Sequence, residues 1–237
     1  MKKKIFALMV CIAMLAVAVV GGTLAYFTDE DEIANTMTLG NVAIEQHEYE
    51  RDANGALVPF TQDKMLVPIV GENEMEEVCD YTDQICTNEN VQDKFVRVEN
   101  TGNVDAYIRT LIAIECNEGN EEPNFGTNKV GVKHASLGAN LVTINSATYY
   151  IHEVVYLDKV APKEFTPMSL EQIWLSSKAT NETAKALDVN GNGALDVLVL
   201  SQAVQADGFD DAQTALDTAF GDLTAANAVE WFKNIAP

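Results

Sequence analysis

Short segments in which apolar and polar residues alternate recur along most of the chain. Thr36–Glu45 alternates in this way, and so does Lys94–Asn100. Thr101–Asn103 then gives a turn signal, and Ala106–Glu115 follows as a second β-rich run. An alternation of period two is typical of half-buried β-strands. We therefore expect the segments on either side of the turn to form a hairpin or a strand-turn-strand corner.

Further β-rich runs continue this pattern toward the C-terminus. They are Leu141–Ile144, Tyr149–Leu157, Met168–Leu175 and Leu195–Gln205. The runs are irregularly spaced, and no helical segments alternate with them, which disfavours a parallel α/β fold. The sequence predicts a mainly β protein built as an antiparallel β-sandwich.

Only the C-terminal tail, about residues 210–235, has a helical pattern. Asp210 is a candidate N-cap for a helix that ends at Gly221, and Thr224 is a candidate N-cap for a second helix. The apolar faces of the two helices would be Ala212, Ala215, Leu216, Ala219 and Phe220, and then Ala228, Trp231, Phe232 and Ile235. We expect two short helices that pack on the sandwich.

The first 25 residues differ in character from the rest. Lys2–Lys4 precede an unbroken apolar run over Ile5–Val20, and small residues follow up to Ala25. A cationic start, an apolar middle and a small-residue end are typical of a secretory signal peptide. We expect a signal peptidase to cleave between Ala25 and Tyr26, which leaves 26–237 as a single exported domain.

An uncleaved membrane anchor is the alternative for this segment. The apolar run of 16 residues is shorter than the roughly 20 residues that a membrane-spanning helix needs. The length therefore favours cleavage, and we expect contact with the membrane only through the uncleaved signal.

The chain is strongly acidic, with 15 Lys and Arg against 36 Asp and Glu and a net charge of −21. Loss of Lys2–Lys4 with the signal leaves 12 cationic residues against 36 acids, a charge of −24. A field of this sign repels phosphate backbones and anionic lipid headgroups. We therefore expect no nucleic acid as a partner, and cations are favoured.

Four cysteines are present, and the first leaves with the signal. Cys79 and Cys86 enclose a short polar segment, so they form the candidate disulfide that closes the smallest loop. Cys116 would remain at the end of an apolar run. It is either a half-buried thiol at a strand end or a partner in an intermolecular bridge.

One loop carries the ligand spacing of a calcium site. Asp188, Asn190, Asn192 and Asp196 occupy positions 1, 3, 5 and 9 of an EF-hand-type loop, with glycine at position 6. Position 12, where such loops carry a bidentate glutamate, is Val199. We expect at most weak Ca²⁺ binding. An Asn-Gly turn between two strands is the alternative, for which the segment is equally well built.

The three histidines lack the spacing that a zinc protease needs. A zinc protease of the HExxH type needs two histidines one helical turn apart, but in His152–Tyr156 a tyrosine replaces the second. The surrounding residues are β-branched and aromatic, which favours a strand. His47 also lacks a second histidine, and His134 stands alone in a Gly/Lys-containing loop. We therefore expect no enzyme activity.

Several segments resemble the TasA/camelysin family of Gram-positive secreted proteins with SipW-type signal peptides. The matching segments are Gly22–Asp29, Asn35–Val42, Lys94–Arg109 and Ser201–Phe209. The resemblance implies a jelly-roll-like β-sandwich, export, and a place at the cell surface or in the biofilm matrix. Camelysins are classed as metalloendopeptidases, an activity that the missing metal ligands make the least favoured here.

The resemblance also implies a mode of assembly. Proteins like TasA form fibres by donating the mature N-terminal segment as a strand to the next subunit. Here that donor would be Tyr26–Ala34, with Tyr26, Phe27, Thr28 and Ile33 as the donor-strand residues. The partner is then a second copy of the chain. The alternatives are that the two aromatics fold back on their own subunit and that the protein is a monomeric secreted binding module.

Overall fold

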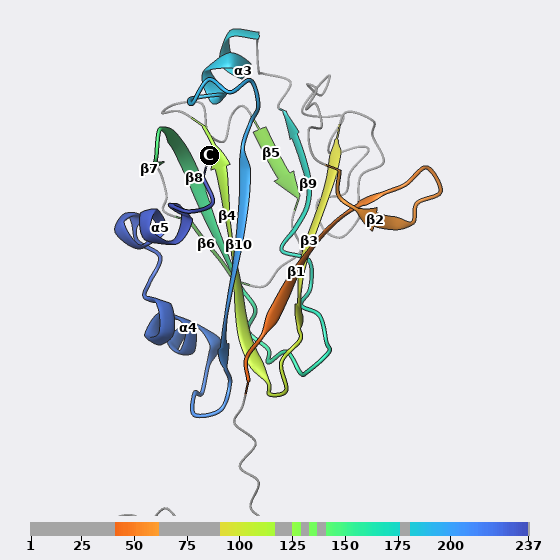
Figure 1. Ribbon diagram of the computed structural model, residues 1–237, viewed down its shortest axis with the longest axis vertical. Coiled ribbons are helices and arrows are strands. Elements are labelled where there is room, and N and C mark those ends of the chain that lie inside the picture. The colour runs from red at the N-terminus through yellow and green to blue at the C-terminus, as the bar shows by residue number, and fades with distance from the viewer. Residues whose placement is uncertain are drawn as a thin grey trace, which may run out of the picture. The chain divides into compact units, whose positions relative to one another are not determined.

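The computed structural model describes most of the chain between Asn41 and Ala236 (Figure 1). The described ranges are 41–61, 91–116, 125–128, 133–136, 141–175 and 181–236. Outside them lie the predicted signal peptide with its cleavage point, the predicted donor residues, and both cysteines of the candidate disulfide. Those expectations therefore stay predictions.

The described residues form strands for the most part. The strands are β1 (Ile44–Arg51), β2 (Leu57–Pro59), β3 (Gln92–Asn100), β4 (Ala106–Glu115), β5 (Phe125–Asn128), β6 (Lys133–Ser136), β7 (Val142–Ile144), β8 (Ala147–Val155), β9 (Leu170–Leu175) and β10 (Val197–Gln205). The helices are α3 (Asn181–Leu187), α4 (Ala212–Phe220) and α5 (Ala225–Phe232). The prediction of a mainly β protein is confirmed.

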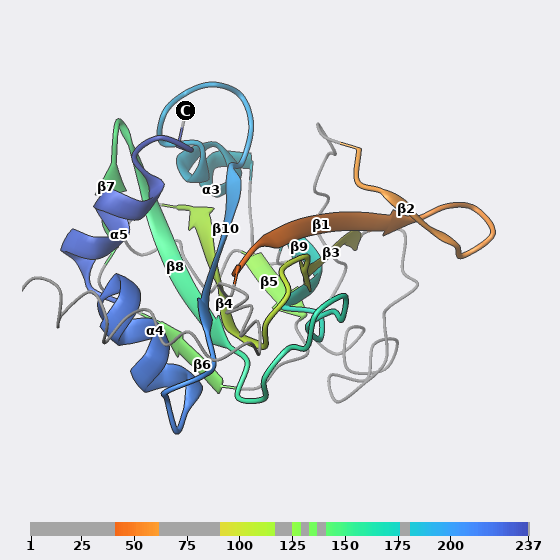
Figure 2. The same ribbon diagram turned by 60° about the horizontal axis from the view of Figure 1, so that its bottom comes forward.

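The strands form two antiparallel sheets (Figure 2). The first sheet has the order β2-β1-β3-β9-β5. The second has the order β10-β4-β8-β6, and β7 also pairs with β8. Every pairing between the described strands is antiparallel, as the sequence predicted.

The main core lies between the two sheets. Val96 and Val98 of β3 pack in one cluster with Ile112 and Ile114 of β4 and Val154 of β8. All ten residues of β4 are buried, because the outer face of the second sheet is covered as well. Its covering consists of α4 and α5, which contribute to two further apolar clusters on that face.

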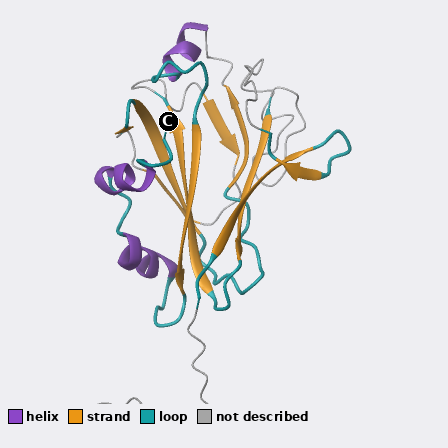
Figure 3. Cartoon of the chain, viewed as in Figure 1, coloured by secondary structure: helices purple, strands orange, loops and turns teal. Residues whose placement is uncertain are grey.

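The C-terminal residues after β10 form two short helices, as expected (Figure 3). Both begin at capping side chains. The N-cap of α4 is Asp211 and not Asp210, since Asp211 Oδ1 accepts the Thr214 N–H at 2.9 Å. Gly221 ends that helix as predicted. Thr224 caps α5. None of the described helices is long and apolar enough to cross a membrane.

The helix faces are narrower than predicted. Ala212, Ala215 and Leu216 of α4 are buried, and so are Ala228 and Phe232 of α5. The other members of the predicted faces are Ala219, Phe220 and Ile235, which are exposed, and Trp231, which is half-buried. Each helix has only about two turns, so the residues at the C-terminal end of each predicted apolar face lie beyond the part of the helix that packs on the sheet.

Three further expectations need correction. Of the strand predicted over Thr36–Glu45, residues 36–40 lie outside the described residues, and 41–43 are not in a strand, because they bond to a neighbouring corner. The described strand runs from Ile44 to Arg51. The helix Asn181–Leu187 was not predicted, since seven residues are too few for a recognisable apolar stripe. His134 lies in strand β6 and not in a loop.

The turn after β3 is a corner and not a hairpin, because β3 and β4 belong to different sheets. Asn100 is fully buried there, and its side-chain amide donates to the carbonyls of Val104 and Val160, both at 2.8 Å. A Cβ at Gly102 would lie 2.2 Å from the Asn41 carbonyl oxygen, so only glycine fits. The corner after β3 therefore packs closely against the backbone at Asn41, where the described part of the chain begins.

Cys116, directly after β4, is completely buried. The sequence predicted a half-buried thiol or an intermolecular bridge. Burial of the sulfur favours a packing role, because a thiol in a bridge to another chain has to be reachable from that chain.

Candidate functional site

Strand β10 forms the edge of the second sheet and pairs, among the described strands, only with β4. Just beyond its two ends, the Glu115 N–H donates to the Asp196 carbonyl and the Ala206 N–H donates to the Asp105 carbonyl, both at 2.9 Å. Hydrogen-bonded residues alternate along an antiparallel strand. The even-numbered residues of β10 therefore form backbone hydrogen bonds with β4, and the odd-numbered residues of β10 direct their N–H and C=O groups away from β4. We call these outward groups the open edge; they belong to Val197, Val199, Ser201, Ala203 and Gln205.

The open edge lacks the features that usually protect a sheet edge. The sequence of β10 is VLVLSQAVQ, with no charged residue and no proline. Its register with β4 continues over nine residue pairs without a bulge. Charges, prolines and bulges are the usual means by which proteins prevent another strand from pairing. This edge is therefore suited to accept a strand.

Strand β1 of the first sheet lies beside the open edge (Figure 1). The Ser201 hydroxyl donates to Gln46 Oε1 at 2.8 Å, which links the two sheets at this flank. The segment Ile44–Glu48 pairs with β3 on one side, while β2 pairs only with the end of β1. Two strand edges thus border the same flank of the sandwich.

The candidate calcium loop leads directly into β10. Helix α3 ends at Leu187, the loop runs from Asp188 to Asp196, and β10 begins at Val197. Asp188 Oδ2 accepts the Gly193 N–H at 2.8 Å, and Gly193 has φ 87°. Asn190 Oδ1 accepts the Asn192 N–H at 2.9 Å. These contacts close a tight turn, so the four predicted ligand residues lie in one loop.

The polar groups of this loop also satisfy one another. Asp196 Oδ2 accepts the side-chain amide of Asn190 at 2.8 Å and that of Asn192 at 3.0 Å. Both amides would have to present their oxygens to a cation instead, which removes two hydrogen bonds. Val199, at position 12, packs against the core and supplies no ligand. The arrangement supports an Asn-Gly turn as well as a weak calcium site.

Glu115 anchors the loop from the end of β4, and the sequence analysis did not identify it. Its carboxylate is buried and accepts three backbone N–H groups, from Val189 at 2.8 Å, Asn190 at 3.0 Å and Asp196 at 3.2 Å. Burial raises the pKa of Glu115 above its ordinary value, and the Asp196 charge adds to the shift. A cation in the loop would favour the charged form of this carboxylate.

We expect calcium to bind this loop weakly. With a dissociation constant of about 1 mM, typical of extracellular modules, about 10 mM Ca²⁺ stabilises the protein by about 1.4 kcal/mol. The melting temperature Tm then rises by about 3–5 °C. Differential scanning calorimetry of the parent and of Asp188→Asn tests this expectation.

Asp158→Asn is the matched control, because Asp158 is exposed and lies outside the loop. The control should keep the calcium shift and Asp188→Asn should lose most of it. An equal shift in all three proteins would show that calcium acts on the acidic surface in general, and the Asn-Gly turn would be the better interpretation.

Arg109 holds β10 in place from β4. It is completely buried, its Nε donates to Gln202 Oε1 of β10 at 2.8 Å, and its Nη1 donates to Glu153 Oε1 of β8 at 2.8 Å. Nη1 also lies 3.2 Å from Asp217 Oδ1 of α4, and Nη2 donates to the Gly221 carbonyl at 3.0 Å. One side chain thus joins three strands of the second sheet to the end of α4.

The protease-like segment does not form a zinc-binding helix. His152 lies in strand β8, as the sequence predicted, and Tyr156 follows the end of that strand. The ring of His152 contacts Tyr150 edge-on, with centroids 4.7 Å apart. The two-ligand helical geometry of a zincin is therefore absent from this described segment.

Comparisons with known proteins give no match: no family model, curated protein or solved structure is significantly similar to this chain. The assignment of a function therefore rests on the sequence and on the geometry above.

Proposed function

We propose that this protein is a secreted structural subunit of the cell surface or biofilm matrix, and that its subunits assemble into fibres by strand donation. One chain would donate Tyr26–Ala34, and the open edge of β10 in the next chain would accept it. The observation that supports this proposal best is that edge, which is nine residues long, uncharged and free of bulges. Strand addition gives each outward N–H and C=O group a partner.

The surroundings of the open edge favour an incoming strand. On one side of β10, Val197, Val199 and Ala203 pack against the main core; on the other, Leu198 and Leu200 pack against the cluster of α5. An added strand would therefore extend an apolar environment on both faces. The aromatic side chains of Tyr26 and Phe27 fit such an environment.

The proposal includes a jelly-roll arrangement of the two sheets, which the resemblance to the TasA/camelysin family implies. It also includes cleavage after Ala25. In the precursor, Tyr26 and Phe27 continue the apolar signal segment, so they cannot enter a neighbouring subunit. Cleavage would release them, and polymerisation would follow export.

Deletion of Tyr26–Ala34 from the mature protein tests the proposal. We expect the parent to form fibres and the truncated protein to stay folded and monomeric, because its open edge has no donor. Size-exclusion chromatography and negative-stain electron microscopy measure this. Tyr26→Ser/Phe27→Ser is the companion variant, which keeps the length of the segment and removes its aromatic rings.

Two outcomes would contradict the proposal. Fibres from both variants that equal those of the parent would exclude donation by this segment. A parent that stays strictly monomeric across protein concentration, salt and calcium would instead favour a monomeric secreted binding module.

A further inference from the structure

Glu45, His47 and Glu99 form a compact group on the outer face of the first sheet. Glu45 and His47 lie two residues apart on β1, and Glu99 of β3 is the direct cross-strand partner of Glu45. One carboxylate oxygen from each glutamate and one imidazole nitrogen all lie within 4.8 Å of one another. His47 Nε2 is 3.2 Å from Glu99 Oε2. Two strands therefore bring together three metal-ligating side chains.

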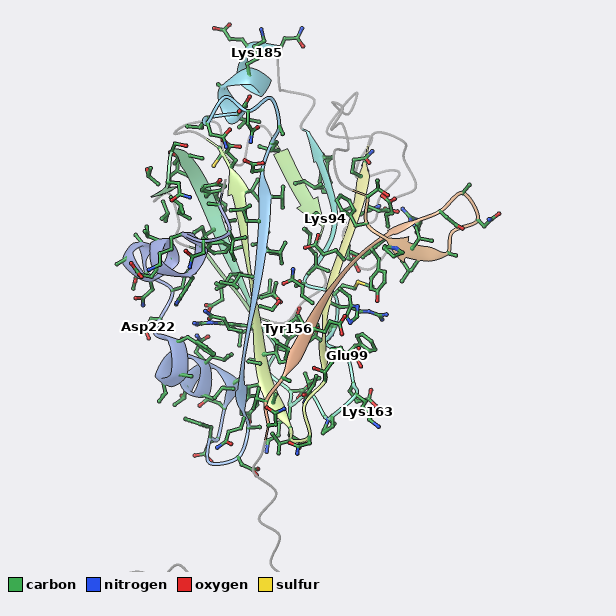
Figure 4. The ribbon with its side chains drawn as sticks, in the orientation of Figure 1. Lys94, Glu99, Tyr156, Lys163, Lys185 and Asp222 are labelled. Carbon is green, nitrogen blue, oxygen red and sulfur yellow. The ribbon has the colours of Figure 1, made fainter. Side chains whose placement is uncertain are left out.

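The group faces away from the second sheet. Gln46, between Glu45 and His47, reaches Ser201 of β10, so its two neighbours point to the opposite face. Figure 4 shows Glu99 on the side of β3 that faces away from β4 and β10. The side chains of His47 and Glu99 are 21% and 25% exposed. Glu45 is exposed, so a small ion can reach the group from solvent, while the other two ligands are partly shielded from water.

The imidazole is held by aromatic rings before any ion binds. The His47 ring stacks on Tyr49, with centroids 5.8 Å apart and an interplanar angle of 3°, and it also packs against Phe165 at 5.5 Å. A ligand that is already oriented loses little conformational freedom on binding. The stacking therefore favours a specific site over a loose acidic surface.

The charge arrangement favours a cation between the two glutamates. Like charges that lie directly opposite on neighbouring strands destabilise a sheet, and Glu45 lies directly opposite Glu99. The nearby cation Arg97 lies over other groups, 4.1 Å from the ring centroid of Phe165 and 5.1 Å from that of Tyr49. No ion pair joins it to either glutamate within the described part of the chain. A metal ion would relieve the repulsion.

From this geometry we propose that Glu45, His47 and Glu99 bind one Zn²⁺ ion per chain. One imidazole nitrogen and two carboxylate oxygens suit zinc or a similar late first-row ion, whereas Ca²⁺ takes six to eight oxygen ligands. Three protein ligands leave a coordination position for water. The bound ion would join β1 to β3 across the sheet. The site is complete within one chain, so it does not depend on the proposed assembly.

Isothermal titration calorimetry of the mature protein with ZnCl₂ tests the proposal, at physiological salt and with millimolar Ca²⁺ present. The calcium is included to compete with Zn²⁺ for weak acidic sites on the surface. We expect saturable binding of one Zn²⁺ per chain with a micromolar dissociation constant. His47→Gln and Glu99→Gln should each weaken binding by more than about tenfold, since even the loss of an outer-shell partner has an effect of that size.

His152→Gln is the matched control, because His152 lies in β8 of the other sheet. Its zinc affinity should stay within twofold of the parent, and thermal unfolding without metal should confirm that each variant is folded. Absence of saturable binding in the parent would overturn the proposal. The proposal would also be overturned if His47→Gln bound zinc as tightly as the parent does. The same holds if His47→Gln and His152→Gln weakened zinc binding equally.

Discussion

Ala203→Pro is expected to leave the mature protein folded and to abolish fibre formation. Ala203 is an odd-numbered residue of β10, so its N–H belongs to the open edge and not to the ladder with β4. Proline is tolerated in an edge strand where the missing N–H faces outward. It removes one donor from the acceptor surface, and its ring obstructs an approaching strand. The effect on assembly should therefore be far larger than the effect on stability.

Electron microscopy and thermal unfolding of the same samples measure both effects. We expect Tm to fall by less than about 5 °C and fibres to be absent at about ten times the concentration at which the parent assembles.

Ala203→Ser is the control for side-chain size, since it keeps the N–H, and it should assemble normally. Gln202→Pro should instead destabilise the fold, because the Gln202 N–H bonds to β4. Fibres of Ala203→Pro that match those of the parent would contradict acceptance by this edge.

Arg109→Ala is expected to lower the free energy of unfolding by about 3–5 kcal/mol, the usual cost of breaking a buried ion pair. Glu153 is only 2% exposed, so its charge would remain buried without the guanidinium. Gln202 and the Gly221 carbonyl would also lose a donor. Urea denaturation followed by circular dichroism measures the loss.

The double variant Arg109→Met/Glu153→Met separates charge from packing. Replacing both charges by apolar side chains often restores stability, so we expect it to be more stable than Arg109→Ala. Lys233→Ala is a control for a surface ion pair: Lys233 pairs with Glu230 on the surface, and its loss should cost less than about 1 kcal/mol. A loss of that small size for Arg109→Ala would show that the buried network does not stabilise the packing of α4 on the sheet.

The strands that the sequence predicted well are those whose limits are set locally. Ala106–Glu115 matches β4 residue for residue, since a turn precedes it and its apolar run ends where the strand ends. The start of β1 was misplaced because it is set by a contact between distant residues. The Asn41 N–H donates to Asn103 Oδ1, 62 positions further along the chain. Local alternation carries no information about such a contact.

The residues of the candidate sites were harder to predict, because their contacts also join residues that are far apart in the sequence. Glu115 accepts the N–H of Val189, which lies 74 positions away, and His47 lies 52 positions from Glu99. A signal for part of this was present, since Arg109 and Glu115 are the charged residues of a largely apolar strand. Buried charges need partners, so each could have been marked as the centre of a polar network. The identity of the partners depends on the fold.

The corner at Gly102 gives the subunit a polarity. Hydrogen bonds from Gly102 to Ala43 and from Asn103 to Asn41 fix the point at which the N-terminal segment joins the sandwich. The proposed acceptor is a different surface, the open edge along β10. An interface between two unlike surfaces is heterologous, and unless it closes into a ring it continues as an open filament. The two ends of such a filament would differ, one with an unfilled β10 and the other with an unused donor segment, so a subunit without a donor could terminate growth at only one of them.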